Sequence, residues 1–383
     1  MAQSVLILGG GVGGLVAANV LRKRLPKGHR ITLVDREKSF SLAASFLWVM
    51  TGDRTPEQVS RPLARLERKG INVIRGDIQR IDPARREAVV DGKTVSADYM
   101  IVALGADFVP SAIPGLAEAG HTFCNLEGAV RLRDALRTFD AGRVVVLTAA
   151  PAYKCPAAPY EAAMLLEAQW RRQGVRDKVT IDLYASEPAP MGVAGPETSA
   201  MVTQMVEQQG IAYHPQHQVT RVSPGERRIE FGNGKTADFD LLVFVPPIRA
   251  PQVVREAGLT GDSGWVSVDR HTLETAFPNV YAVGDVTVIP LTMGKPLPKA
   301  GVFAHAQAEA VARNIASAIS GKERGAGFDG HGVCFIESGN GRAGYGGGDF
   351  YAEPRPAVKM HRPSMLWHAG KVLFEKHWFW SWL

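Results

Sequence analysis

The stretch 4-SVLILGGGVGGLVAANVLRK-23 decides the fold of this chain. It begins as a buried strand, turns through three glycines in G-x-G-x-x-G register (Gly9, Gly11 and Gly14), and continues as a helix. The next strand, 31-ITLVD-35, ends in Asp35, 21 residues after Gly14. Glycines let a backbone approach a pyrophosphate, a helix N-terminus attracts its charge, and the carboxylate accepts a ribose hydroxyl. The stretch therefore predicts a Rossmann-like dinucleotide site.

The chain also contains an internal repeat with an offset of about 140 residues. Residues 70–105 and 210–246 both open on Gly-Ile and share a later Gly-Lys-Thr, and 5-VLILGG-10 matches 144-VVVLTA-149. Each copy is expected to contain a β-hairpin that feeds back into a parallel strand. The predicted fold class is α/β, with two tandem Rossmann-like domains of which the first is discontinuous. The predicted boundaries are 1–112 and 240–320 for the first domain, 113–239 for the second, and 321–383 for a C-terminal region with an aromatic anchor helix.

The second copy lacks the residues that a nicotinamide cofactor needs. Its turn, 149-AAPAYKCPAAP-159, contains no glycine, and Ala185 stands where Asp35 stands in the first copy. Side chains and rigid prolines would block the close approach of a pyrophosphate. The second domain is therefore predicted to have no nicotinamide site.

Two further stretches indicate which dinucleotide the first copy binds. The segments 98-DYMIVALGA-106 and 278-PNVYAVGDV-286 each run as an apolar strand into a glycine. They resemble the two-dinucleotide-binding flavoprotein superfamily over nearly the whole chain. The resemblance implies FAD as the cofactor, bound with the help of Gly105, Gly284 and Asp285.

A third set of motifs is more specific. The run KCPAAPYE at 154–161, the late cysteine in 332-GVCFIESGNG-341, and 366-LWHAGKVLFEK-376 resemble the sulfide:quinone oxidoreductases, close kin of the flavin subunit of flavocytochrome c sulfide dehydrogenase. The resemblance implies that Cys155 and Cys334 form a redox pair, with Cys334 nearer the flavin ring. Hydrosulfide would attack the bridged pair, two electrons would pass to FAD, and sulfur would leave as polysulfide.

The same resemblance implies roles for other residues. Glu161 would accept a proton if burial raises its pKa, but it also fits a solvent-facing position in the first turns of a helix. Cys124 would tether FAD, bind sulfur transiently, or merely pack. Lys299 and the helix starting near Gly301 would stabilise the reduced flavin, and Phe335 would contribute to a quinone pocket. Some members carry histidines at the places aligned with Gly128 and Val193, so their proton relay does not transfer to this chain.

Composition limits the partners. The formal net charge is +6, but the basic residues are scattered, which argues against nucleic acid. The three cysteines, Cys124, Cys155 and Cys334, fit neither a disulfide scaffold nor a zinc site, so no metal is predicted. The run 339-GNGRAGYGGGDFY-351 is expected to be a loop and strand edge.

The C-terminal end predicts contact with a membrane. In 365-MLWHAGKVLFEKHWFWSWL-383, apolar residues recur at helical spacing, and Lys371 and Lys376 flank them. This pattern is typical of a helix lying at a bilayer interface. With no secretory signal or spanning segment in view, the expected location is the cytoplasmic face of the cell membrane, peripheral. A helix of the core or of a homo-oligomer interface is the competing interpretation.

Four functions remain open at this stage. The leading one is oxidation of sulfide with a membrane quinone as acceptor, which makes sulfide and quinone the expected partners. The alternatives are a flavocytochrome c-type subunit, a type II NADH dehydrogenase, and a flavin redox sensor without turnover. Flavin reduction by sulfide rather than by NADH, followed by reoxidation by quinone, distinguishes the first from the others.

Overall fold

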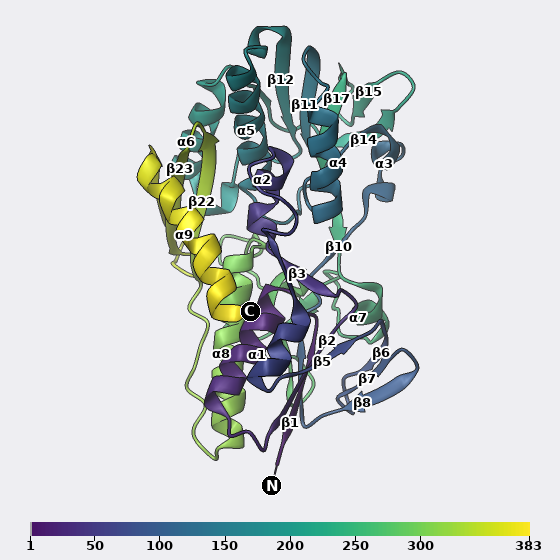
Figure 1. Ribbon diagram of the computed structural model, residues 1–383, viewed down its shortest axis with the longest axis vertical. Helices are drawn as coiled ribbons and strands as arrows, with labels where there is room; N and C mark the ends of the chain where they lie inside the picture. The colour runs from purple at the N-terminus through teal and green to yellow at the C-terminus, as the bar shows by residue number, and fades with distance from the viewer. Residues whose placement is uncertain (1) are drawn as a thin grey trace.

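The computed structural model describes residues 2–383 and contains two parallel sheets in tandem (Figure 1). The first sheet has the strand order β20-β9-β1-β2-β5, with bounds β1 Ser4–Leu8, β2 Arg30–Asp35, β5 Asn72–Arg75, β9 Tyr99–Val102 and β20 Val280–Ala282. The second has the order β13-β12-β11-β17, with β11 Gly142–Thr148, β12 Val179–Ala185, β13 Ala212–His214 and β17 Leu241–Val245. The predicted α/β class with two Rossmann-like units is confirmed.

The strands of the first sheet are continuous apolar runs because both faces are covered. β1 is buried from Val5 to Leu8 and pairs in parallel with β2 and β9. One face packs on α1 (Val12–Arg24) and α8 (Gly301–Ile319), which lie side by side. The other face forms a separate apolar cluster with β6 (Ile78–Asp82), β7 (Glu87–Val90) and α7 (Gln252–Glu256). The glycine turn that follows β1 is therefore held by a rigid, fully packed strand.

The internal repeat is visible as two matching antiparallel sheets. One consists of β6 (Ile78–Asp82), β7 (Glu87–Val90) and β8 (Lys93–Ser96), and the other of β14 (Val219–Ser223), β15 (Arg228–Phe231) and β16 (Thr236–Asp238). Each leads into a parallel strand, β9 in the first copy and β17 in the second. The predicted hairpins are thus three-stranded meanders that return the chain to the main sheet.

The chain crosses between the two domains at a short antiparallel pair, β10 (Asp107–Phe108) with β18 (Ile248–Arg249). The predicted return at residue 240 comes too early. Because β17 pairs in parallel with β11 along Val144–Thr148, residues 241–245 belong to the second sheet. The crossing therefore falls after Val245.

The C-terminal region is an antiparallel sheet followed by a helix along one side of the molecule (Figure 1). Its elements are β22 (His331–Gly339), β23 (Arg342–Asp349), β24 (Ala357–Ser364) and α9 (Met365–Trp382). The glycine-rich run 339–351 is expected from the sequence to be a loop and strand edge. Most of it is instead β23, the central strand of this sheet. A Cβ at Gly348 would lie 1.9 Å from the Ala357 oxygen, so glycine lets the strands approach closely.

The tail of α9 is docked on the first domain rather than free. Trp378 and Phe379 are buried, and the Trp378 ring stacks on Phe40 at 4.6 Å. Asn19 Nδ2 donates to the Trp382 oxygen at 3.0 Å. The exposed apolar residues instead form a face that we call the apolar face of α9, composed of Met365, Leu366, Leu373, Phe374 and Trp380. Of the aromatic residues in the last turns, Trp380 is thus the one that is largely exposed.

The remaining elements complete the two domains. They are β3 (Ser39–Ser41), β4 (Ser60–Pro62), β19 (Val266–Ser267), β21 (Thr287–Val288), α2 (Phe46–Met50), α3 (Leu116–Ala119), α4 (Leu126–Leu136), α5 (Ala158–Gln173) and α6 (Pro196–Glu207). Within residues 2–383, none of the helices combines the length and the apolar character that crossing a bilayer requires.

Candidate active site

The turn after β1 forms the first part of a dinucleotide cradle. Gly9 has φ +106°, and a Cβ at Gly14 would lie 1.8 Å from the Gly9 oxygen. A Cβ at Gly11, by contrast, would meet nothing within 4 Å. The turn is thus closed on its inner side and open at the N-terminus of α1, where a pyrophosphate needs room. Asp35, at the end of β2, accepts hydrogen bonds from the Gly10 and Glu37 amides at 2.5 and 2.7 Å.

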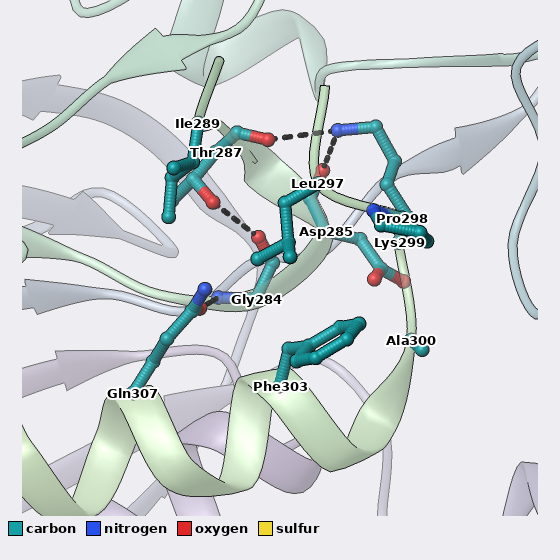
Figure 2. A pocket seen from close by; sticks show the side chains of 10 residues that line it. All are labelled: Gly284, Asp285, Thr287, Ile289, Leu297, Pro298, Lys299, Ala300, Phe303 and Gln307. Atoms are coloured by element: carbon teal, nitrogen blue, oxygen red, sulfur yellow. Dashed lines mark hydrogen bonds between the residues drawn. The ribbon is translucent and has the colours of Figure 1, made fainter. Parts of the chain in front are cut away.

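A second helix N-terminus meets the first. The Val283 to Asp285 turn packs between the two helices, since a Cβ on Gly13 of α1 would come within 2.9 Å of Val283. On the α8 side, Gln307 Oε1 accepts the Gly284 amide at 2.7 Å. Figure 2 shows this turn over the start of α8, lining one pocket with it. Two helix N-termini, a glycine cradle and a carboxylate at the strand edge fit a dinucleotide of the FAD type.

Replacing Gly14 by alanine tests the cradle. Its Cβ would overlap the Gly9 carbonyl, so the turn must open and α1 must move from β1. We expect the variant to purify with less than about a tenth of the bound flavin, a loss of at least 1.4 kcal/mol in binding. The measurement is flavin absorbance per protein. The control is Gly28→Ala, where a Cβ meets nothing within 4 Å; equal flavin content in both variants would contradict the assignment.

Lys299 occupies a buried position next to this pocket. Its ammonium donates to the backbone oxygens of Asp285 and Thr287 at 2.7 and 2.8 Å (Figure 2). It also lies 3.5 Å from the centre of the Trp265 ring. Burial lowers its pKa to about 8, against the opposing effect of Asp285. The predicted flavin-binding lysine is thus near Gly284 and Asp285, with its charge already shared between two carbonyl groups.

The structure brings Cys155 and Cys334 together. Cys155 lies in the loop before α5 in a left-handed conformation, φ 55°, and its amide donates to the Lys299 oxygen at 2.8 Å. Cys334 lies in β22, paired with Gly346 of β23. A hydrogen bond between the two thiols, together with burial and the charge of Glu161, raises the pKa of Cys155 well above its ordinary value. The raised pKa keeps the Cys155 thiol protonated.

A buried charged cluster borders the thiols. Lys371 Nζ donates to Glu161 Oε1 at 3.0 Å and lies 3.9 Å from Glu337 Oε1, while His368 Nδ1 lies 3.0 Å from Glu337 Oε2. Burial opposes the charge on Lys371, but the two carboxylates raise its pKa above its ordinary value. Burial raises the pKa of Glu337, although Lys371 and His368 lower it. We call these four residues the buried cluster.

Two sequence interpretations are corrected here. Glu161 is buried, so the alternative of a solvent-facing carboxylate is wrong. Lys371 is also buried and cannot flank a lipid anchor as predicted. Neither Glu337 nor His368 was singled out from the sequence. The available signal was the spacing of His368 and Lys371, three residues apart on one face of an apolar helix.

Cys124 lies apart from the charged cluster. Burial raises its pKa to about 11, and its amide donates to Thr122 Oγ1 at 3.1 Å. Nearby, a Cβ at Gly128 would lie 2.5 Å from the Thr122 oxygen, which leaves no room for a histidine in this loop. Val193 packs against the core of the first domain. The two positions therefore offer no proton-transfer group.

Phe335 belongs to an aromatic group beneath α9. Its ring centre is 5.2 Å from that of Tyr345 and 6.4 Å from that of Phe374, and Trp367 stacks on Tyr345 at 4.5 Å. Phe374 is part of the apolar face of α9. This group joins the strand that carries Cys334 to the outer surface of the helix.

The end of the second sheet is filled by the chain itself. Glu187 follows β12 by two residues, and its carboxylate accepts the hydroxyl groups of Tyr153 and Tyr160 at 2.5 and 2.7 Å. Its other oxygen accepts from Thr148 Oγ1 at 2.9 Å. The Glu187 carboxylate, at a position where a ribose hydroxyl could bind, therefore already accepts hydrogen bonds from protein side chains on both of its oxygens.

No set of three or more His, Cys, Asp or Glu side chains in residues 2–383 is arranged to hold a metal ion.

Comparisons with known proteins agree with this geometry. Residues 3–310 match the family model described as pyridine nucleotide-disulphide oxidoreductase. The sulfide-quinone reductase of Aquifex aeolicus is 30% identical over 100% of this chain and 91% of its own length. The mitochondrial sulfide:quinone oxidoreductase of Mus musculus is 24% identical over 91% of this chain and 79% of its own. The X-ray structure of the sulfide:quinone oxidoreductase from Aquifex aeolicus superposes with a TM-score of 0.89 at 27% identity, covering 99% of this chain and 91% of that one.

Proposed function

The chain belongs to the pyridine nucleotide-disulphide oxidoreductase family, as an FAD-dependent enzyme of the sulfide:quinone oxidoreductase type, and we propose that it oxidises sulfide to polysulfide through Cys155 and Cys334 and reduces a membrane quinone. The observation that carries the proposal is the contact of these two thiols, which lie 179 residues apart in the sequence. Bound FAD accepts two electrons from the sulfur chemistry and delivers them to the quinone.

The thiol pair suits attack by hydrosulfide. When the two sulfurs are bridged, hydrosulfide cleaves the bridge and leaves a persulfide on one cysteine and a thiolate on the other. Lys371 stabilises negative charge on Cys334, since the two groups interact favourably. Cys155, whose pKa the neighbouring Cys334 and burial raise, would carry the persulfide, with the thiolate on Cys334 facing Lys371.

A nicotinamide donor is disfavoured by the second domain. The segment 149–159 contains three prolines and no glycine. The hydroxyl groups of Tyr153 and Tyr160 donate hydrogen bonds to the Glu187 carboxylate. Opening this site would leave the half-buried Glu187 carboxylate and two buried tyrosine hydroxyl groups without these hydrogen-bond partners. Electrons are thus expected from sulfide rather than from NADH.

Quinone reduction is assigned to the side of Phe335 and α9. The aromatic group around Phe335 leads to the apolar face of α9, where Leu366 and Trp380 have 71% and 83% of their surface exposed. Large apolar residues exposed on one helix fit an interfacial helix that lies on a bilayer. This arrangement gives a lipid-soluble quinone a short route to the site.

The apolar face predicts membrane binding. Replacing Leu366, Leu373 and Trp380 together by serine removes three exposed side chains, each worth about 1.5 kcal/mol or more when buried in lipid. We expect co-sedimentation with lipid vesicles to weaken by at least about 100-fold in the partition coefficient. Replacing the exposed residues Glu127, Arg131 and Asp134 of α4 by serine is the control. Unchanged sedimentation of the α9 variant would assign this face to a protein contact instead.

The function itself is tested by steady-state assay. The purified flavoprotein is mixed with sulfide and a short-chain quinone, and loss of quinone absorbance is followed. We expect turnover that requires sulfide and that NADH cannot replace. Turnover with NADH but not with sulfide would support a type II NADH dehydrogenase, and flavin reduction by sulfide without quinone turnover would support a redox sensor.

A further inference from the structure

The most unusual feature outside the flavin cradle is the row of charges in the buried cluster. Its members come from three elements: Glu161 from α5, Glu337 from β22, and His368 and Lys371 from α9. Glu161 Oε1 accepts from Lys371 at 3.0 Å and from the Glu337 amide at 2.9 Å. Glu337 then contacts His368 Nδ1 through both oxygens, at 3.0 and 3.1 Å. The polar contacts are therefore continuous from α5 to the outer helix.

The two ends of this row differ in their access to water. The side chains of Glu161, Lys371 and Glu337 are 4%, 6% and 1% exposed, whereas that of His368 is 31% exposed. A proton on the inner groups can therefore reach solvent through His368. The centre of the Trp48 ring, which has no titratable group, lies 6.0 Å from that of the His368 ring and 4.9 Å from Lys371 Nζ.

The inner end touches the reacting thiols. The charges of Glu161 and Lys371 both act on Cys155, and Lys371 also acts on Cys334. Two other charged pairs lie nearby: Lys154, which directly precedes Cys155, with Asp285 at 3.9 Å, and Arg54 with Glu375 at 3.0 Å beside Ser45 and Trp48. The row through Glu161 and Lys371 leads from the thiols to α9.

Stability alone does not explain such a cluster. Buried ion pairs are often no more stabilising than apolar residues of similar size, because desolvation offsets the attraction. This cluster also has two carboxylates for one ammonium, so an additional proton can be taken up and passed on. Burial favours the neutral form of Glu337, so the additional proton is expected to bind to this carboxyl group.

We propose that Glu161, Lys371, Glu337 and His368 form a proton path from the Cys155 and Cys334 thiols to the surface of α9. The inference rests on the proposed function and adds to it the route by which its protons leave. It also gives the thiols a proton-transfer route that needs no histidine at Gly128 or Val193, because its members lie on α5, β22 and α9.

The proton balance of the reaction requires such a route. Hydrosulfide and the bridged pair give a persulfide and a thiolate: the S–S bond breaks and a new S–S bond forms. The thiolate and the persulfide then join as a trisulfide, and the formation of this S–S bond releases two electrons, which bound flavin would accept, and one proton. A second proton was lost when hydrogen sulfide became hydrosulfide. Quinone takes up both electrons and two protons, so the proton released at the buried thiols needs a route to the side of α9, where the quinone is proposed to bind.

The test removes the outer end of the path. His368→Gln is expected to slow sulfide-dependent quinone reduction by about 100-fold, the usual effect of removing a proton-transfer group. Added imidazole should restore most of the rate, because it can deliver protons to and from Glu337. Glu337→Gln should be equally slow but not restored by imidazole. His377→Gln, on the exposed side of the same helix, is the control and should be unaffected.

A second measurement tests the inner end of the proton path, next to Cys155, without catalytic turnover. The rate of Cys155 alkylation is followed against pH by mass spectrometry. Glu161→Gln should lower the midpoint, since a negative charge that raises the Cys155 pKa is lost, and Lys371→Met should raise it. Unshifted midpoints, or a fully active His368→Gln enzyme, would overturn the path while leaving the function intact. An unmodified enzyme that sulfide cannot reduce would overturn the proposed function, and the path with it.

Discussion

Replacing either Cys155 or Cys334 by alanine is expected to leave the flavin oxidised when sulfide is added. With only one sulfur, the pair can neither be opened by hydrosulfide nor deliver electrons from a thiolate beside a persulfide. Removing a residue that acts as part of such a unit costs at least about 10³-fold in rate. The measurement is stopped-flow absorbance of the bound flavin without oxygen. Both single variants and the double variant should be equally inactive, because the two sulfurs act as one unit.

The controls separate chemistry from folding. Each variant should keep the flavin content of the unmodified protein, since neither thiol donates to the cradle around Gly9 and Gly14. His331→Ala, at the exposed start of β22, should react normally with sulfide. Rapid bleaching of either cysteine variant would show that sulfide reduces the flavin directly, and the role of the pair would have to be abandoned.

Replacing Lys371 by methionine is expected to cause the largest loss of stability. The change leaves Glu161 and Glu337 facing each other in a dry site without the ammonium between them. Removing one partner of a buried ion pair costs about 3–5 kcal/mol. Denaturant unfolding with excess FAD should show this loss. Lys376→Met, an exposed lysine five positions later, is the matched control and should change stability by less than about 0.5 kcal/mol.

The loss should depend on pH in a defined direction. Burial raises the pKa of Glu337, and removing Lys371, which lowers it, raises it further. A carboxyl whose folded pKa is raised favours the folded state below its unfolded pKa, and this advantage is lost as pH rises through the folded pKa. The stability difference between the variant and the unmodified protein should therefore shrink toward pH 5. If the loss in free energy of unfolding were the same at pH 5 and pH 8, or no larger than that of Lys376→Met, the cluster could not be charged as described.

Much of the fold could be predicted from the sequence because its signals are local. The glycine turn at Gly9, the strand before it and the acid at Asp35 are dictated by backbone geometry within one βαβ unit. The repeat located the second sheet and both meanders. The predicted boundary at residue 240, where the chain returns to the first domain, comes too early. No local feature of the sequence shows that β17 is a strand of the second sheet and not of the first.

The site was harder to predict because its parts come from distant segments. No spacing rule brings Cys155 next to Cys334, and only the resemblance to a family suggested it. Lys371 was misinterpreted because lysine beside exposed aromatic residues is typical of membrane anchors. Its burial depends on Glu161 and Glu337, which are 210 and 34 residues away in the sequence. Long-range charge pairing of this kind leaves no periodic signal.

The most direct test of the central claim is anaerobic flavin absorbance of the unmodified protein, with sulfide and NADH added in separate cuvettes and a short-chain quinone added afterwards. Our account predicts that sulfide bleaches the flavin, that quinone restores its colour, and that NADH has no effect. Bleaching by NADH and not by sulfide would contradict the account, because it would require a working nicotinamide site where Tyr153, Tyr160 and Glu187 now lie.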